Sequence, residues 1–212
     1  MSEKKKLNSP LRVTPTSVLK VSKSARTRAA ILNSALDFLW TRPFREMTIA
    51  SLMAGTDVGR SAFYQHFTDL HEVMVNLLEM VQGEIFEAAE PFITGNGDPM
   101  AAMHESLAGL VRVGYDRGPF LRAIVDATTT DGRLELVWKE FLDNFDKALT
   151  IRIEANQEAG LTEDFDAQPV AFALNRLDAY TLIQAFGRHP RKDPEPVREA
   201  LTRIWNATLY NK

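Results

Sequence analysis

Apolar side chains recur every three or four residues along most of this 212-residue chain, which is the spacing of amphipathic helices. In the stretch 132–159, four large side chains follow one another at steps of four, three and four residues and so share one helix face: Trp138, Leu142, Phe145 and Leu149. Convincing strand alternation is absent from the sequence, and no segment repeats. The pattern therefore predicts an all-α protein.

Capping residues, prolines and glycines mark the ends of about nine predicted helices. The first begins at Ser24 and is closed by Pro43, and Thr48 can cap the short helix that follows. The segment Gly55–Gly59 separates this short helix from the next. The remaining helices are predicted over 60–67, 70–90, 99–116, 119–128, 132–159, 167–186 and 194–210.

Charge is divided unevenly between the two ends of the chain. Residues 1–70 hold 11 Lys and Arg against 5 Asp and Glu, whereas residues 71–212 hold 14 against 23. A basic N-terminal part on an acidic remainder suggests a polyanion-binding head on a body that nucleic acid repels. Residues 1–23 mix Lys with Ser, Thr and Pro and lack periodicity, so we expect a flexible basic arm there.

Composition excludes several other classes of protein. Cys is absent, which rules out disulfides, thiolate metal sites and cysteine nucleophiles. The longest stretch without a charged residue, Met47–Thr56, is half as long as the roughly 20 residues that a membrane-spanning helix needs. The first residues lack the apolar run of a secretory signal, and the four histidines are scattered. We therefore expect a cytoplasmic protein with no metal or other cofactor.

The segment 48–67 has the spacing of a helix-turn-helix, in which a tight turn joins two short helices. The residues predicted to face inward are apolar: Ile49, Leu52, Val58, Phe63 and Phe67. Those predicted to face outward are small or polar: Gly59, Arg60, Ser61, Tyr64, Gln65 and His66. Arg60 can pair with guanine and Gln65 with adenine, while the hydroxyl and imidazole groups suit phosphate oxygens. The segment predicts a reader of double-stranded DNA.

The run VGRSAFYQHF, preceded by RAAILNSALDFL and MTIASL, resembles the DNA-binding domain of the TetR family of bacterial repressors. The resemblance implies that Tyr64 and His66 clamp the DNA backbone. It places Arg60, Ser61 and Gln65 nearest to the base edges. It also implies that Thr48 caps the second helix and can meet a phosphate.

Three positions depart from the pattern of this family. Asp57 stands at the usual turn glycine, Gly59 at the usual serine cap, and Leu70 at the usual phosphate-binding lysine. The last departure puts that phosphate contact in doubt, although His71 or the basic arm could replace it.

The stretches LELVWKEFLDNF, AFALNRLDAYTLIQAFG and LTRIWNATLY are similar to one TetR branch, the ethionamide-responsive repressors. The similarity implies a long, mostly apolar ligand channel through a helical body. The matching positions are His104, Val111, Tyr115, Trp138, Leu142, Phe145, Leu149, Asn175, Asp178, Ile183 and Trp205. Because so few of them are polar, we expect a lipophilic small molecule as the ligand. From spacing alone, an ordinary core is the favoured explanation of the same apolar face.

Asn175 and Asp178 interrupt the apolar stripe of the helix predicted over 167–186. Burying an amide or a carboxyl group is costly unless the group is paired, so these two could orient a ligand in an apolar cavity. Asp178 could instead pair with Arg176 or Arg122, or face solvent.

The last two predicted helices offer a surface on which a second copy could pack. Ala171, Ala179, Ala185 and Gly187 permit close helix approach, and the final helix carries an apolar stripe of Val197, Leu201, Ile204, Thr208 and Leu209. The resemblance implies a four-helix interface between two subunits, and the alternative is packing within one subunit. Two recognition helices about 34 Å apart would read a palindromic operator.

Together these features predict a three-part TetR-type regulator, and a repressor in particular. It would have the arm over 1–23, a DNA-binding domain over 24–69, and a ligand-binding and dimerisation domain over 70–212. One alternative is a DNA-binding protein with a filled core and no effector. The other is a helical enzyme that uses Asp178 and His104, but the sequence holds no established catalytic motif and we expect no enzyme.

Overall fold

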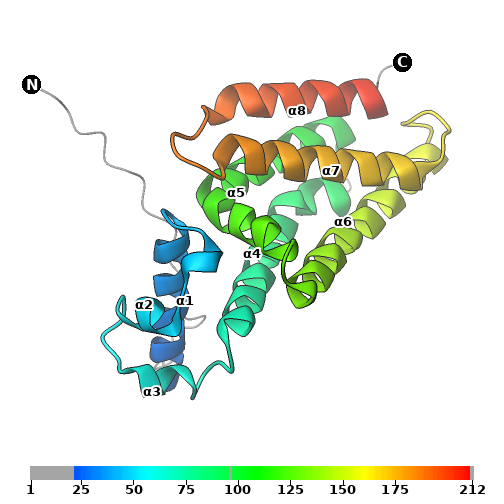
Figure 1. Ribbon diagram of the computed structural model, residues 1–212. Coiled ribbons are helices and arrows are strands. Elements are labelled where there is room, and N and C mark those ends of the chain that lie inside the picture. The colour runs from blue at the N-terminus through cyan, green and yellow to red at the C-terminus, as the bar shows by residue number, and fades with distance from the viewer. Residues whose placement is uncertain (1–21, 96, 211–212) are drawn as a thin grey trace, which may run out of the picture. The chain divides into compact units, whose positions relative to one another are not determined.

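The computed structural model describes residues 22–95 and 97–210. Within these ranges it contains eight α-helices, one short 3-10 helix and no strand, so the all-α prediction is confirmed (Figure 1). No described helix is both long enough and apolar enough to span a membrane. The predicted basic arm lies outside the described residues, apart from Ser22 and Lys23.

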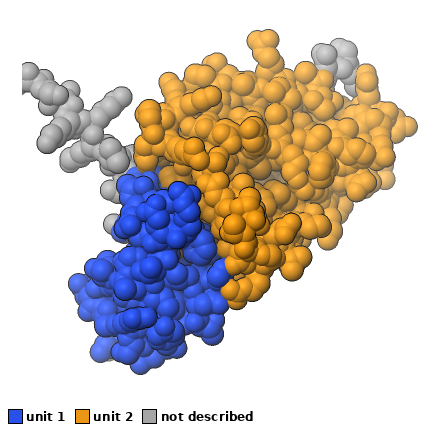
Figure 2. Space-filling model, viewed as in Figure 1, with its two compact units in different colours: residues 1–74 blue, residues 75–212 orange. Residues whose placement is uncertain are grey.

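The chain divides into two compact units, residues 1–74 and 75–212 (Figure 2). The division falls inside one helix, α4 (Leu70–Ile93), which contributes residues to both units. The first unit also contains α1 (Lys23–Leu39), η1 (Phe44–Glu46), α2 (Ile49–Met53) and α3 (Arg60–Phe63). The second contains α5 (Pro99–Thr128), α6 (Gly132–Glu158), α7 (Ala167–Phe186) and α8 (Pro194–Leu209).

Side-chain caps fix where the helices of the first unit begin. Thr48 Oγ1 accepts a hydrogen bond from the Ser51 amide at 3.0 Å, and Ser51 Oγ accepts one from the Thr48 amide at 2.9 Å. This reciprocal pair satisfies two amides that a helix start would otherwise leave unpaired. The predicted cap at Thr48 is therefore confirmed, and Asp69 likewise caps α4 through the Glu72 amide at 2.9 Å.

The core of the first unit brings α1 very close to the end of α2. Ser34 Oγ on α1 donates to the Leu52 carbonyl oxygen at 2.6 Å. A Cβ atom on Gly55 would lie 2.3 Å from the same Ser34 Oγ. A larger residue at position 55 would therefore displace the Ser34 hydroxyl from its hydrogen bond to Leu52.

The third helix is shorter than predicted. It ends at Phe63, and Tyr64–His66 lie in the turn that follows, whereas the sequence pattern predicted a helix over 60–67. Gly59 gives the helix no side-chain cap. Downstream, the backbone amide of Thr68 donates to Glu72 in the first turn of α4. Thr68 therefore already belongs to the N-terminal cap of α4.

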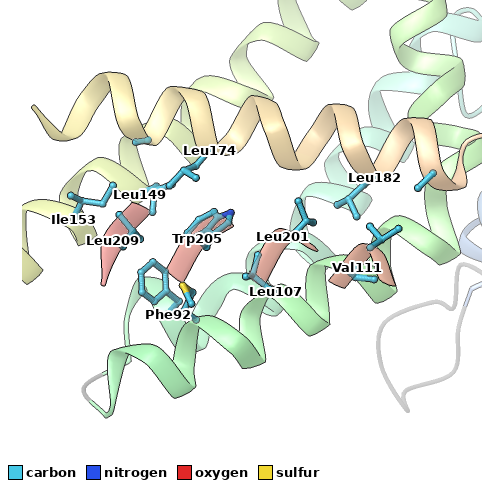
Figure 3. Close-up of a cluster of buried hydrophobic side chains, with 14 of the residues drawn as sticks. Phe92, Leu107, Val111, Leu149, Ile153, Leu174, Leu182, Leu201, Trp205 and Leu209 are labelled. Atoms are coloured by element: carbon cyan, nitrogen blue, oxygen red, sulfur yellow. The ribbon is translucent and has the colours of Figure 1, made fainter. Parts of the chain in front are cut away.

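The core of the second unit lies between α4, α5, α6, α7 and α8. Figure 3 shows the indole of Trp205 on α8 among apolar side chains such as Phe92, Leu149 and Leu174. The predicted bounds of α7 match the structure, and those of α6 and α8 differ by one residue at the C-terminal end. Gly160, predicted to terminate α6, has a positive φ of 69°.

Helix α4 continues past Pro91, where the sequence predicted its end. Proline cannot donate a backbone hydrogen bond, and the ladder is disturbed around it. Ser106 on α5 supplies hydrogen bonds at this point of α4. Its hydroxyl accepts one from the Phe92 amide at 3.1 Å and donates one to the Ala89 carbonyl at 3.2 Å. A side chain from another helix therefore allows α4 to reach Ile93.

Helix α5 is also continuous, although two helices separated near Pro119 were predicted. Proline at 119 leaves the carbonyl of Tyr115, four residues earlier, without its helical donor. The guanidinium of Arg191, beyond the end of α7, donates to that carbonyl and lies 3.8 Å from the centre of the Tyr115 ring. Since Arg191 supplies the missing hydrogen bond, the helix is not broken.

Candidate functional site

The polar residues predicted to contact DNA lie together at the surface of the first unit. We call the following set the ridge: Thr48, Gly59, Arg60, Ser61, Tyr64, Gln65 and His66. All are exposed except His66, which is half-buried. Tyr64 keeps 58% of its surface accessible, which is unusual for so large a ring. The structure therefore leaves these side chains accessible to a partner.

Two buried phenylalanines underlie the ridge. Phe63 and Phe67 are almost fully buried, and their ring centroids are 5.8 Å apart. The Tyr64 ring meets Phe63 edge to face at 5.4 Å. Of the other predicted inward residues, Leu52 is fully buried, while Ile49 and Val58 are half-buried. The aromatic pair fixes the backbone that carries Tyr64, Gln65 and His66.

The departures from the TetR pattern have distinct local consequences. Apart from its chain neighbours, no described residue comes within 4 Å of a Cβ built on Gly59, so the missing side chain there leaves the start of α3 open. His71 was a possible substitute for the lysine replaced by Leu70. Its ring contacts Phe44 at 5.8 Å and its Nδ1 lies 3.8 Å from an Asp69 carboxyl oxygen.

The second unit contains a cavity of about 70 Å³ between α4, α5, α6 and α7, which we call the central cavity. Sites for drug-sized ligands measure roughly 300–1,000 Å³, so such a ligand would need the surrounding side chains to move apart. Six of the residues predicted to bind a ligand line it: Trp138, Leu142, Phe145, Asn175, Asp178 and Ile183. The remaining lining residues of the cavity were not predicted to bind a ligand: Ile85, Leu110, Gly114, Leu121, Phe141, Ala179 and Leu182.

A smaller hollow of about 40 Å³ adjoins the central cavity and extends toward α8. The two share Leu110, Phe145 and Asn175 as lining residues. The predicted residues Leu149 and Trp205 line only the smaller hollow. Most of the predicted channel residues are therefore gathered along one path through the unit.

Three predicted ligand residues line neither hollow. Val111 is buried in the apolar core, and Tyr115 packs edge to face on Phe186 at 5.3 Å. His104 is joined to Asn206 by a side-chain hydrogen bond, with the two nitrogens 3.0 Å apart. Each of the three makes packing or pairing contacts within the fold, and its part in ligand binding stays a prediction.

Polar groups in the central cavity are few and specifically paired. Asn175 donates its amide nitrogen to Asp146 Oδ1 at 2.9 Å, and Arg176 forms two hydrogen bonds with the same carboxylate at 2.9 and 3.0 Å. An ionised carboxylate can only accept, so the amide orientation of Asn175 is fixed. The amide oxygen of Asn175 remains as an acceptor.

Asp178 is only 7% exposed and accepts a hydrogen bond from Trp205 Nε1 at 3.1 Å. Burial raises the pKa of this carboxyl to about 7, and the Trp205 hydrogen bond opposes that rise. Pairing with Arg176 or Arg122 was considered from sequence. Arg176 instead pairs with Asp146, and Arg122 with Asp126 at 2.9 Å.

Phe141 is the most informative residue that the sequence reasoning missed in the cavity. Its ring stacks on Trp138 at 5.0 Å and meets Phe145 at 5.2 Å. It lies three residues after Trp138 and four before Phe145, so the helical spacing could have included it. Gly114 gave no comparable signal, because only its closeness to Leu182 in the fold reveals why it lines the cavity.

Most residues predicted to form a dimer surface are buried within the subunit. Ala171, Ala185, Val197, Leu201 and Leu209 all belong to the apolar core, and Gly187 is buried as well. Only Ile204 and Thr208 are exposed, and Ala179 lines the central cavity. The apolar stripe of α8 faces the other helices of its own subunit, so this part of the prediction is wrong.

Comparison with known proteins decides the family. Residues 103–211, just over half of the chain, match the family described as transcriptional regulator EthR, C-terminal domain. The chain is a TetR-family regulator with an EthR-type C-terminal half. Relatives of the regulator include EthR of Mycolicibacterium smegmatis, with 24% identity over 86% of this chain and 85% of that protein.

Solved structures of the same fold agree with this assignment. The regulator superimposes with a TM-score of 0.75 on a Rhodococcus protein described as a TetR-family transcriptional regulator, at 15% identity and covering 86% of this chain and 98% of the other. A protein described as a transcriptional regulator from Saccharomonospora viridis, in complex with choline, gives a TM-score of 0.71 at 16% identity. The match covers 89% of the regulator and all of that chain.

Proposed function

We propose that this TetR-family regulator is a repressor that binds a palindromic operator as a homodimer, and that a lipophilic small molecule in the central cavity modulates it. In this proposal residues 24–69 form the DNA-binding domain and residues 70–212 bind the ligand and the second subunit. The observation that carries the proposal is the exposed, polar and cationic ridge above the buried Phe63 and Phe67.

The charges of the chain support the assignment of the ridge to DNA. The net positive charge of residues 1–70 attracts phosphates, and the acidic remainder disfavours binding elsewhere on the protein. Within the ridge, Arg60 carries the fork of donors that suits guanine. The relatives of this chain are transcriptional regulators, which agrees with this assignment rather than with the enzyme alternative.

The central cavity supports control by a ligand. The cavity of about 70 Å³ is lined by a few polar groups among apolar ones, which is the lining of a small-molecule site. The structure of the Saccharomonospora viridis protein in complex with choline concerns the same fold. The enzyme alternative required Asp178 and His104 to act together. Asp178 is instead hydrogen-bonded to Trp205, and His104 to Asn206.

Linkage supplies the mechanism of control. In a dimer, the two DNA-binding domains must have the spacing of the two operator half-sites. A ligand that prefers a conformation of the second unit without that spacing must weaken DNA binding, typically by about 1–3 kcal/mol. Helix α4 belongs to both units, so we assign it the role of transmitting the change.

Single substitutions in the ridge test the proposed roles in DNA recognition. Tyr64→Phe should weaken binding to every duplex alike, by about fivefold, because it removes one hydroxyl that meets a phosphate. Gln65→Ala should cost about 1–3 kcal/mol on the preferred operator and much less on other sequences, because it removes contacts to a base. Fluorescence anisotropy on duplexes selected from a random pool measures both.

Salt dependence and a matched control complete this experiment. Wild-type binding should weaken steeply with salt because phosphate contacts release counterions. Gln157→Ala replaces a glutamine of the second unit that bonds the Phe165 carbonyl, and should leave the base preference unchanged. Equal losses on all sequences from Tyr64→Phe and Gln65→Ala would reject the division of roles.

The exposed side of α7 and α8, in place of the buried apolar stripe of α8, is the dimer surface that we propose. Phe172 and Tyr180 on α7 remain 52% and 68% exposed, and Ile204 on α8 is 40% exposed. Helices α7 and α8 contact each other and lie side by side in Figure 1. Large exposed apolar residues on two adjacent helices are typical of a subunit interface, and we propose a second copy as their partner.

A charge placed on this surface should separate the subunits. Tyr180→Asp is expected to give a monomer by size exclusion with light scattering, because the new carboxylate would be buried unpaired in the interface. Operator affinity should fall as well, since one head alone reads half a site. Leu136→Asp is the control, because Leu136 is 69% exposed but lies on α6. A dimeric Tyr180→Asp variant would contradict the proposed surface.

A further inference from the structure

The polar groups that α7 contributes to the central cavity are acceptors when Asp178 is ionised, whereas Trp138 on α6 carries an indole N–H donor. Asp178 contributes a carboxyl group, and Asn175 contributes its amide oxygen because its nitrogen is committed to Asp146. Within the described residues the hydrogen bond from Trp205 is the one that reaches Asp178. Among the residues that the structure describes, no lysine, arginine or histidine lines this cavity. A ligand that matches these groups must therefore bring donors or positive charge.

Aromatic rings surround the rest of the same space. Trp138, Phe141 and Phe145 all line the cavity and contact one another in sequence along α6, with centroids 5.0 and 5.2 Å apart. Phe86 on α4 extends this row by stacking on Phe145 at 4.2 Å. The faces of aromatic rings attract cations, most strongly where water is excluded. The rings and the carboxyl group thus favour the same kind of ligand.

We propose that the central cavity binds an organic cation, a lipophilic molecule whose substituted ammonium group lies between Asp178 and the aromatic row of α6. The apolar part of the ligand would extend past Leu110 and Phe145 into the adjoining hollow. This inference deepens the ligand-binding part of the proposed function and rests on it, because it names the chemical class of the effector.

The protonation of Asp178 gives this ligand class a distinctive pH dependence. Burial raises the pKa of Asp178 to about 7, so the empty cavity holds a largely neutral carboxyl group below neutral pH. The cation favours the ionised form, and affinity should therefore rise about tenfold per pH unit below pH 7 and level off above it. In the described part of the chain, α4 and α5 supply apolar groups to the lining, and α8 reaches Asp178 through Trp205. The nearest other charges, Asp146 and Arg176, lie behind Asn175 and pair with each other.

Three probes of similar length and different charge test the proposal by isothermal titration calorimetry on the full chain. They are octyltrimethylammonium, decanol and decanoate, each used below its micelle concentration. The ammonium probe should bind most tightly at pH 8. In Asp178→Asn its affinity should fall about tenfold or more and lose its pH dependence, while decanol binding should stay unchanged. The unchanged decanol affinity would show that the cavity is intact.

Controls separate failure of this inference from failure of the proposed function. Asp164→Asn makes the same chemical change at an exposed position and should leave all three affinities unchanged. The proposal of a cationic ligand would be rejected if decanol bound as tightly as the ammonium probe or more tightly. It would also be rejected if the affinity for the ammonium probe changed neither with pH nor in Asp178→Asn. Either result would still be compatible with a lipophilic effector. If none of the probes binds, both are overturned. Should Asp178→Asn fail to fold, the pH profile of the wild-type protein decides alone.

Discussion

Phe63→Ala is expected to unfold the first unit and abolish DNA binding while ligand binding in the second unit persists. Phe63 is fully buried and contacts the rings of Tyr64 and Phe67. Truncating a buried phenylalanine costs about 3–5 kcal/mol, which is much of the stability that a unit of this size can have. Circular dichroism should show a separate early melting transition, and fluorescence anisotropy should show no operator binding.

A second phenylalanine of the same unit is the matched control. Phe38 on α1 is half-buried, and its ring contacts the Arg42 guanidinium at 4.6 Å. Phe38→Ala should cost about 1 kcal/mol, because less apolar area and one exposed cation–π contact are lost. Retention of full operator affinity by Phe63→Ala would show that the ridge does not depend on the aromatic pair beneath it.

Glu84→Ala is expected to destabilise the second unit by about 3 kcal/mol, because it removes the carboxylate partner of a buried cation. The Arg117 side chain is only 3% exposed, and its two contacts with the Glu84 carboxylate measure 2.8 and 2.6 Å. The pair joins α4 to α5, so we also expect weaker coupling between ligand and operator. Urea denaturation followed by tryptophan fluorescence measures the loss.

Two comparisons show whether burial causes this effect. Glu195→Ala removes the carboxylate from an ion pair with Arg198 at the surface of α8 and should change stability little, because water already screens the pair. Replacing both Glu84 and Arg117 by methionine should recover most of the stability lost by Glu84→Ala. Equal stability of Glu84→Ala and wild type would mean that Arg117 needs no carboxylate there.

Sequence-local signals predicted the helices well where the ends depend on neighbouring residues. Thr48 and Asp69 cap helices through amides three residues away, and Gly160 closes α6 with its own backbone. The prolines misled the prediction. Pro91 and Pro119 remain inside helices because Ser106 and Arg191, which are distant in the chain, repair the ladder. No window of neighbouring residues contains that information.

The candidate sites show the same limit. Helical spacing identified the apolar face of α6 that lines the cavity, and polarity singled out Asn175 and Asp178 on α7. Spacing could not tell which helix covers an apolar stripe. The stripe of α8 was therefore assigned to a second subunit, although Val197 and Leu201 pack within their own. The partner of Asp178 was equally unreadable, because Trp205 reaches it only in the folded chain.

Helix α4 limits where the DNA-binding unit of one such regulator can be joined to the second unit of another. Its buried stripe crosses the division between the units without interruption, with Val73 and Met74 on one side and Leu77, Leu78 and Val81 on the other. Each inserted residue would turn the following side chains by about 100° around the helix axis. Recombination between relatives at this junction is therefore tolerated only when the helical phase is kept, as with an insertion of about seven residues, which is close to two whole turns.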